Sequence, residues 1–164
     1  RDGRKAAPLG IRLNGDAELF MPLRIEAGNG GGINLVPVDH FLGVFRALFE
    51  DELEGGVFHI VNPRPTTIAE IVGHTRRYFR LAGMEACGPE AFAASPRNAL
   101  ERLYESMLDA YRPYMGDARR FDDARSAPAR ERRGLSCPVF DYDIFARCMR
   151  YAVETDWGAG LLSR

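Results

Sequence analysis

The chain has 164 residues, of which 46% are hydrophobic and 27% charged, and its formal net charge is −1. A chain of this length can bury one sizeable core, so we expect a single lobe over residues 1–164. The near-zero charge argues against a nucleic-acid partner and a polybasic membrane-binding surface, and no apolar stretch approaches the roughly 20 residues of a membrane span.

The first elements predicted along the chain are a strand, a turn and a second strand. Residues 22–27 (PLRIEA) could form a short strand, and the glycines of 28–32 predict a turn. Residues 33–38 (INLVPV) are mostly apolar and predict a buried strand. Asp39 is then the expected N-cap of a helix, because its carboxylate can accept amide protons of the first turn. This helix is apolar on several sides, so we expect more than one side to be covered.

Another strand and helix follow. Residues 57–61 (VFHIV) predict a short strand. Thr67 and Glu70 match the capping box, and the helix that they open is expected to stop at Gly83. Residues 33–83 therefore read as a strand–helix–strand–helix unit, which is typical of α/β proteins.

Residues 84–164 predict a mainly helical lobe. A helix is expected to start at Ser95-Pro96 and to keep its apolar period as far as Met115. Residues 117–133 are charged and irregular, which indicates a surface connection. Asp141 or Asp143 opens a last helix. The predicted class is helix-rich α/β, with a few short strands and four or five helices.

Familiar catalytic and metal motifs are missing from the sequence. His40, His59 and His74 lack the spacing of a helical zinc pair, and no metal site is expected. The glycines of 28–32 are followed by a strand-like run and not by a helix, so they do not match a dinucleotide fingerprint. The arginines of 119–133 could hold a phosphate or phosphopantetheine group, but nearby acids favour a solvated surface.

Three stretches of the chain resemble the C-terminal portion of extended short-chain dehydrogenases/reductases. They are INLVPVDHFLGVFRAL, GGVFHIVNPRPTTIAEIV and PVFDYDIFARCMRYAVETDWG. These proteins belong to the NAD-dependent epimerase/dehydratase superfamily, and the nearest branch is the fatty acyl-CoA reductase, thioester reductase and male-sterility group. Position 40 is His, where these reductases usually have Tyr.

The resemblance implies a substrate-binding portion that lacks the N-terminal Rossmann half. In the family, that half carries the NAD(P) fingerprint and a Tyr-x-x-x-Lys catalytic pair. Here Lys5 is the sole lysine, and Arg1 stands four residues before it. The chain also begins at Arg1 and not at Met, so we expect a fragment without catalytic or cofactor-binding residues. The intact parent would be an NAD(P)-dependent oxidoreductase.

The expected partners are the missing nucleotide-binding half and a small-molecule carbonyl, acyl or thioester substrate, such as an acyl-CoA or acyl-carrier thioester. Asn62 and Arg64 are substrate-binding candidates because α/β proteins bind ligands where strands end. Tyr104, Met107 and Tyr111 are candidates for an apolar substrate wall. Two alternatives remain open: a nucleotide-sugar epimerase or dehydratase domain, and a stand-alone helical binding module without activity.

The cysteines bear on the compartment. Cys87, Cys137 and Cys148 are an odd number and show no CxxC spacing. This pattern indicates reduced thiols and a cytoplasmic protein.

Overall fold

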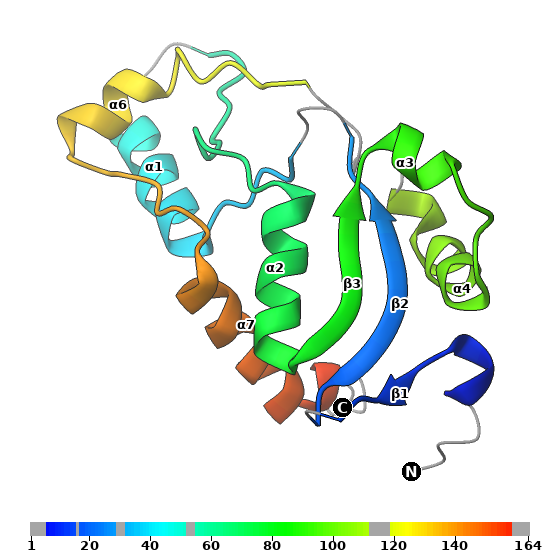
Figure 1. Ribbon diagram of the computed structural model, residues 1–164. Helices are drawn as coiled ribbons and strands as arrows, with labels where there is room; N and C mark the ends of the chain where they lie inside the picture. The colour runs from blue at the N-terminus through cyan, green and yellow to red at the C-terminus, as the bar shows by residue number, and fades with distance from the viewer. Residues whose placement is uncertain (1–5, 16, 29–31, 52–54, 112–118, 159–164) are drawn as a thin grey trace.

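The computed structural model describes residues 6–15, 17–28, 32–51, 55–111 and 119–158, which form a mixed α/β fold (Figure 1). The strands are β1 (Arg12–Leu13), β2 (Leu19–Glu26) and β3 (Leu81–Cys87). The helices are α1 (Val38–Glu50), α2 (Ile68–Phe79), α3 (Pro89–Ala93), α4 (Ala99–Leu108), α6 (Ala127–Arg132) and α7 (Tyr142–Glu154), with 3-10 turns η2 (Ala7–Leu9), η3 (Asp109–Tyr111) and η4 (Asp156–Gly158). The described residues thus confirm the α/β class.

The sheet has the order β1-β2-β3, with β1 antiparallel and β3 parallel to β2. A register shift between Phe20 and Leu23 leaves Met21 and Pro22 opposite Gly83. Gly83 has φ +77°, and a Cβ there would lie 2.7 Å from the Phe20 ring. Glycine is therefore required at this close approach.

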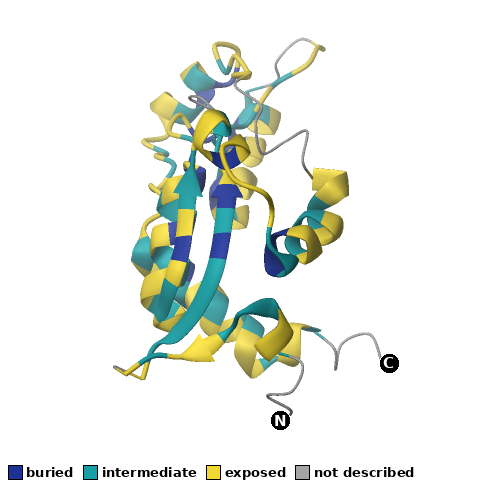
Figure 2. Cartoon of the chain, turned by 45° about the vertical axis from the view of Figure 1, so that its right-hand side comes forward, coloured by how far each residue is buried: buried dark blue, intermediate teal, exposed yellow. Residues whose placement is uncertain are grey.

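One hydrophobic core joins the two long strands to α2 and α4. Its buried members are Leu23, Ile25, Ile68, Val72, Met84 and Leu100. In Figure 2 the buried positions appear on the strands and on the inner sides of the helices. The core thus lies between the parallel strand pair and the helices that flank it.

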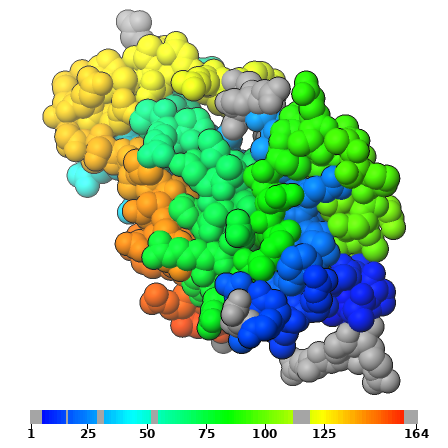
Figure 3. Space-filling model, in the orientation of Figure 1, coloured from blue at the N-terminus to red at the C-terminus, as the bar shows by residue number. Residues whose placement is uncertain are grey.

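Two further packing contacts extend the fold away from the sheet. Helix α7 lies against α2, where Arg77 stacks 3.5 Å from the centroid of the Tyr142 ring, and the two surfaces adjoin in Figure 3. Helix α1 packs against α6, and Val44 and Ala47 of α1 and Ala129 of α6 are buried. Among the described residues no helix is long and apolar enough to cross a membrane.

Several predicted elements are confirmed. The strand predicted at 22–27 is part of β2, and Thr67 caps α2 in a capping box with Glu70. Asp141 caps α7 by accepting a hydrogen bond from the amide of Ile144. In each case the local signal and the tertiary packing favour the same structure.

The strands predicted at 33–38 and 57–61 are wrong. Ile33 forms an isolated antiparallel bridge with Thr66, and no ladder continues from it. Pro37, which has no amide proton to donate, lies where such a ladder would continue. Of the strand–helix–strand–helix unit predicted for 33–83, the two helices are therefore confirmed and the two strands are not.

Helix boundaries account for the other corrections. The prediction that Asp39 caps α1 is wrong, because Pro37 stands at the N-cap. Among the described contacts, the Asp39 carboxylate accepts a hydrogen bond from the amide of His40 alone. Helix α2 ends with Arg80 in the left-handed conformation, and Gly83 lies inside β3. Asn98, and not Ser95, caps α4.

The second half departs from its prediction in two further places. Helix α6 lies within 117–133, where an irregular connection was expected, because Ala129 is buried against α1. The end of the predicted 95–115 helix falls in 112–118, outside the described residues, as do positions 29–31 of the predicted glycine turn.

A buried ion pair links β2 to α4. The Glu101 carboxylate, whose side chain is 1% exposed, accepts from Nε of Arg24 at 2.7 Å and from Nη2 at 2.9 Å. It also accepts from the amide of Asn98 at 2.9 Å. The Arg24 hydrogen bond is the main reason that the pKa of Glu101 is lowered to about 2 from 4.5. The carboxylate is therefore ionised and fully partnered.

We predict that Glu101→Gln lowers the free energy of unfolding by about 3 kcal/mol, because it removes the charge that a buried pair requires. The stabilisation from this carboxylate is present above its unfolded pKa of about 4.5 and is lost as the pH falls towards 2. Urea unfolding between pH 7 and pH 3 measures both effects. The matched control is Glu105→Gln on the same helix, whose partner Arg97 is 41% exposed, and its loss should stay below about 1 kcal/mol. Equal losses in the two variants would contradict the prediction.

A buried histidine lies at the contact between α1 and α6. His40 is 8% exposed, and its Nε2 atom has no hydrogen-bond partner among the described residues. Burial, followed by the positive charge of Arg130, lowers the pKa of His40, although Asp39 and the backbone of Ser136 oppose the shift. The imidazole is therefore neutral in the folded protein near pH 7.

We predict that the protein loses stability as the pH falls below about 6.5, the ordinary pKa of a histidine. The sign follows from the lowered pKa, because the unfolded chain binds the proton more readily than the folded chain. His40→Leu should remove this dependence, whereas His59→Gln, which changes an exposed histidine, should retain it. Urea midpoints from pH 8 to pH 5 provide the measurement. An unchanged pH slope in His40→Leu would refute the assignment.

Candidate functional site

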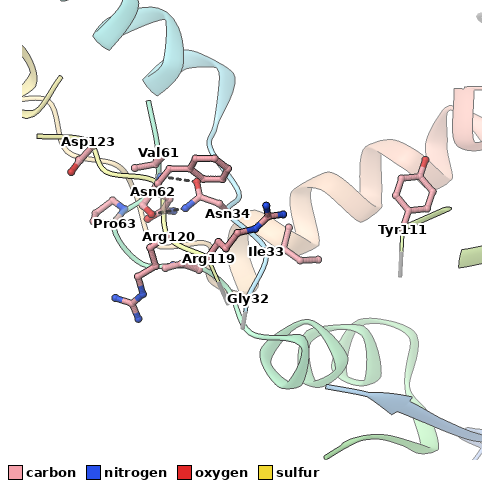
Figure 4. Close-up of a pocket in the computed structure, with 12 residues that line it drawn as sticks. Gly32, Ile33, Asn34, Val61, Asn62, Pro63, Tyr111, Arg119, Arg120 and Asp123 are labelled. Carbon is pink, nitrogen blue, oxygen red and sulfur yellow. Dashed lines mark hydrogen bonds between the residues drawn. The ribbon is translucent and has the colours of Figure 1, made fainter. Parts of the chain in front are cut away.

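A pocket of about 480 Å³ opens where three loop segments meet (Figure 4). Residues 32–34 precede α1, residues 61–65 precede α2, and residues 119–123 precede α6. Tyr111, at the end of η3, lines the opposite side. The volume lies within the range of about 300–1,000 Å³ that is typical of small-molecule sites.

The first two segments are held together by Asn62, which is 2% exposed. Its side-chain amide donates to the carbonyl oxygens of Leu35 at 3.0 Å and Pro138 at 3.2 Å, and its Oδ1 atom accepts from the amide of Arg64 at 3.0 Å. Its backbone N–H and C=O pair with the side-chain amide of Asn34 at 2.9 Å and 2.8 Å. These bonds replace the strand pairing expected from the sequence.

The hydrogen bonds of the Asn62 side chain form a clamp between the loops, and glycine is required at position 32 beside it. A Cβ on Gly32 would lie 2.9 Å from the carbonyl oxygen of Thr66 and 3.1 Å from the Cβ atom of Pro65. The missing side chain lets the 32–34 segment come close enough for the backbone bonds between Ile33 and Thr66, at 2.8 Å and 2.9 Å. The pocket wall is therefore fixed by backbone contacts as well as by Asn62.

Most of the wall is apolar. Ile33, Val61, Pro63, Pro65 and Phe121 line it. The ring of Phe121 packs edge-on against that of His59, with centroids 5.4 Å apart. Such walls favour the apolar part of a ligand, because contact removes apolar surface from water.

The charged lining residues come from the 119–123 segment. Asp123 lies 3.2 Å from the guanidinium of Arg130, so its charge is balanced within the protein. Figure 4 shows the side chain of Arg119 extending towards Ile33, whereas that of Arg120 points the other way.

Two of the predicted substrate residues, Asn62 and Tyr111, line the pocket. Tyr111 is 62% exposed, whereas the side-chain amide of Asn62 is committed to the clamp. A ligand could therefore meet the Tyr111 side chain, but the Asn62 amide has no proton left to donate.

The other three candidates lie elsewhere. Arg64 forms an ion pair of 2.7 Å with Glu70 at the start of α2 and is not among the lining residues. Tyr104 packs against the hydrophobic core, and burial raises the pKa of its hydroxyl. Met107 is 72% exposed on α4. The structure thus does not gather the predicted set into one site.

Asn34, Ile33 and Arg119 line the pocket although the sequence pattern does not single them out as site residues. The pattern around Asn34 and Ile33 predicts a strand and gives no sign of their loop positions. The proximity of Arg119 to 61–65 depends on a loop packing that no local pattern encodes.

Few of the described lining side chains could take part in proton transfer. Tyr111 and Asp123 are the described lining side chains that could exchange a proton, and Asp123 is held by Arg130. Across the described residues, no group of three or more His, Cys, Asp or Glu side chains forms a metal site.

Comparison of the chain with protein-family models, with curated proteins and with solved structures finds no match in any of the three. The fold and the pocket therefore define the protein by class. It is a mixed α/β protein with a ligand-sized pocket formed by its loops.

We predict that Asn62→Ala lowers the free energy of unfolding by about 3 kcal/mol, since it removes three hydrogen bonds made by a buried side-chain amide. Arg64→Ala removes an ion pair from side chains that are 62% and 36% exposed, and should cost less than about 1 kcal/mol. Urea denaturation of both variants tests the assignment of Asn62 to structure. Comparable losses would show that the Asn62 bonds are not the clamp described here.

Proposed function

We propose that this chain is the substrate-binding portion of an NAD(P)-dependent oxidoreductase of the extended short-chain dehydrogenase/reductase type. Its substrate is a carbonyl, acyl or thioester compound, such as an acyl-CoA or acyl-carrier thioester. The reaction requires a separate nucleotide-binding half, and this chain alone transfers no hydride.

The observation that carries the proposal is the meeting of two motif stretches at one pocket. Ile33 and Asn34 belong to INLVPVD, and Asn62 and Pro63 belong to VFHIVNPRP. These stretches carry the resemblance to the family, and the hydrogen bonds between Asn34 and Asn62 join them. A pattern that reflected helix packing alone would not bring its loop residues to a ligand-sized space.

Helix α1 provides a second argument. Its side towards α6 is buried, but a continuous apolar stripe on another side is exposed. The stripe consists of Val38, Phe41, Leu42, Phe45 and Phe49, which are 43–79% exposed. Exposed apolar surface of this extent usually marks an interface. Because the stripe starts at the V-P-V-D joint, we assign it to the nucleotide-binding half.

The N-terminus of α1 does not fit the coenzyme itself. A dinucleotide site needs free amides and positive potential at a helix N-terminus that follows a strand. At α1 the cap is Pro37, which has no amide proton, and the carboxylate of Asp39 lies in the first turn. A pyrophosphate would be repelled there, so the proposal places NAD(P) on the other half.

The cysteines support a cytoplasmic location, which goes with this proposal. Cys87, Cys137 and Cys148 are free thiols in the structure. A cytoplasmic reductase keeps its cysteines in this form.

Thermal-shift measurements on the isolated chain test the proposal. We expect no stabilisation by NADH or NADPH at about 1 mM, whereas an acyl-CoA should raise the midpoint, because a ligand that binds the folded state stabilises it. A complete short-chain reductase serves as the positive control for coenzyme. A clear shift with either coenzyme would mean that the chain has its own nucleotide site, and the proposal would fail. A shift with nucleotide-sugars and none with acyl-CoA would select the epimerase alternative.

A further inference from the structure

We infer that the pocket holds an apolar chain, alkyl or acyl, and that the polar head of the same ligand stays outside the pocket, in water. The inference names the part of the substrate that this site takes, and in that respect it rests on the proposed function. Its evidence is the state of the polar side chains that line the pocket. With the exception of Tyr111, these side chains are used within the chain or directed away from the space.

The side-chain amides of the pocket are already used. Both protons of the Asn62 amide go to carbonyl oxygens, those of Leu35 and Pro138. The amide of Asn34 pairs with the backbone of Asn62. A sugar or a peptide needs such groups for specific hydrogen bonds, and its own polar groups weaken binding when they are buried without partners. The pocket therefore disfavours ligands whose polar groups must enter it.

The charged side chains are equally committed. Asp123 lies 3.2 Å from the guanidinium of Arg130. Arg119 already has an interaction within the chain. Arg120 is exposed, and its side chain points away from Ile33 (Figure 4). Recognition of a charged head by the described lining residues is therefore disfavoured as well.

The remaining lining surface is apolar and is held in place. It is contributed by Ile33, Val61, Pro63, Pro65 and Phe121. The backbone bonds between Ile33 and Thr66, at 2.8 Å and 2.9 Å, fix the first loop against the second. Such a wall binds a chain of methylene groups by removing them from water, and at a smaller entropic cost than mobile loops would impose.

An acyl thioester supplies a chain that meets these conditions. The volume of about 480 Å³ lies in the lower half of the range of about 300–1,000 Å³ for small-molecule sites, which favours entry of one part of the substrate and not of the whole. Tyr111, which is 62% exposed, presents a ring with a polar tip and suits the boundary between an apolar chain and water. The acyl chain therefore enters, and the phosphates of its carrier remain outside.

Isothermal titration calorimetry with straight-chain probes, each below its micellar concentration, tests the inference. Butanol, hexanol and octanol differ in chain length alone, and we expect the affinity to rise about threefold with each added methylene, as its transfer out of water predicts. Octanoate and octylamine differ from octanol in the charge of the head. Their affinities should agree with that of octanol within about tenfold, because salt screens a head in water from the charges around the pocket. An affinity that is independent of chain length, or a larger preference for either charged head, overturns the inference.

Matched substitutions locate the chain in the pocket. Phe121→Leu keeps an apolar side chain in the wall, whereas Phe121→Asn places a polar one of similar size there. Octanol should bind Phe121→Leu within twofold of the unsubstituted chain and Phe121→Asn at least fivefold more weakly. Phe49→Asn is the control, because Phe49 is 79% exposed on α1 and is not among the lining residues, and it should stay within twofold. Equal losses in Phe121→Leu and Phe121→Asn, or in Phe121→Asn and Phe49→Asn, would overturn the assignment.

The variants should remain folded, since Phe121 is 61% exposed, and circular dichroism checks this. The results are also separable from the coenzyme measurement. Octanol that binds through Phe121 in a chain that also binds NADH would keep this inference and refute the proposed function. Stabilisation by an acyl-CoA without coenzyme binding, together with an affinity independent of chain length, would do the reverse.

Discussion

The side chain of Asn62 is the interaction on which the site depends. Three stretches that are distant in sequence, around Leu35, Arg64 and Pro138, converge on one buried amide. Loops normally lie at the surface because their backbone groups need water or partners. Here a single side chain supplies partners for three of those groups. The loops can therefore pack together around the buried Asn62, and the pocket keeps its shape without a β-ladder.

The same clamp explains which parts of the fold could be predicted from sequence. Helices α2 and α7 and the strand β2 follow from local signals, since their caps and periodic apolar positions agree with their packing. The segments 33–38 and 57–61 are apolar enough for strands, yet they become loops because side-chain amides, and not neighbouring strands, satisfy their backbone. Whether such a segment forms a strand or a loop depends on contacts that are distant in sequence, and no short sequence pattern predicts those contacts.

The candidate site was predictable to a smaller extent. The sequence indicates Asn62 because it follows an expected strand, and the residue does reach the pocket, but as a structural hydrogen-bonding group. Tyr111 is indicated as part of an apolar helical stripe, although the helix stops at Leu108 and Tyr111 belongs to a 3-10 turn. Met107, from the same stripe, is exposed. Helical periodicity identifies a face, whereas a pocket between loops requires the tertiary path of the chain.

Helix α1 connects the architecture with the proposed division of labour. Its sequence is apolar on more sides than a surface helix needs, and within the described residues α6 covers one of them, around Val44 and Ala47. Carboxylates at its C-terminal end, Glu50 and Asp51, are paired with arginines of α6 and its C-cap, so that side is satisfied within the chain. The exposed stripe from Val38 to Phe49 has no comparable partner among the described residues. On the proposal above, a nucleotide-binding half covers this stripe, which lies on the same helix whose preceding loop forms the pocket wall at Ile33. Such an arrangement would couple the position of the substrate to that of the coenzyme through one rigid element.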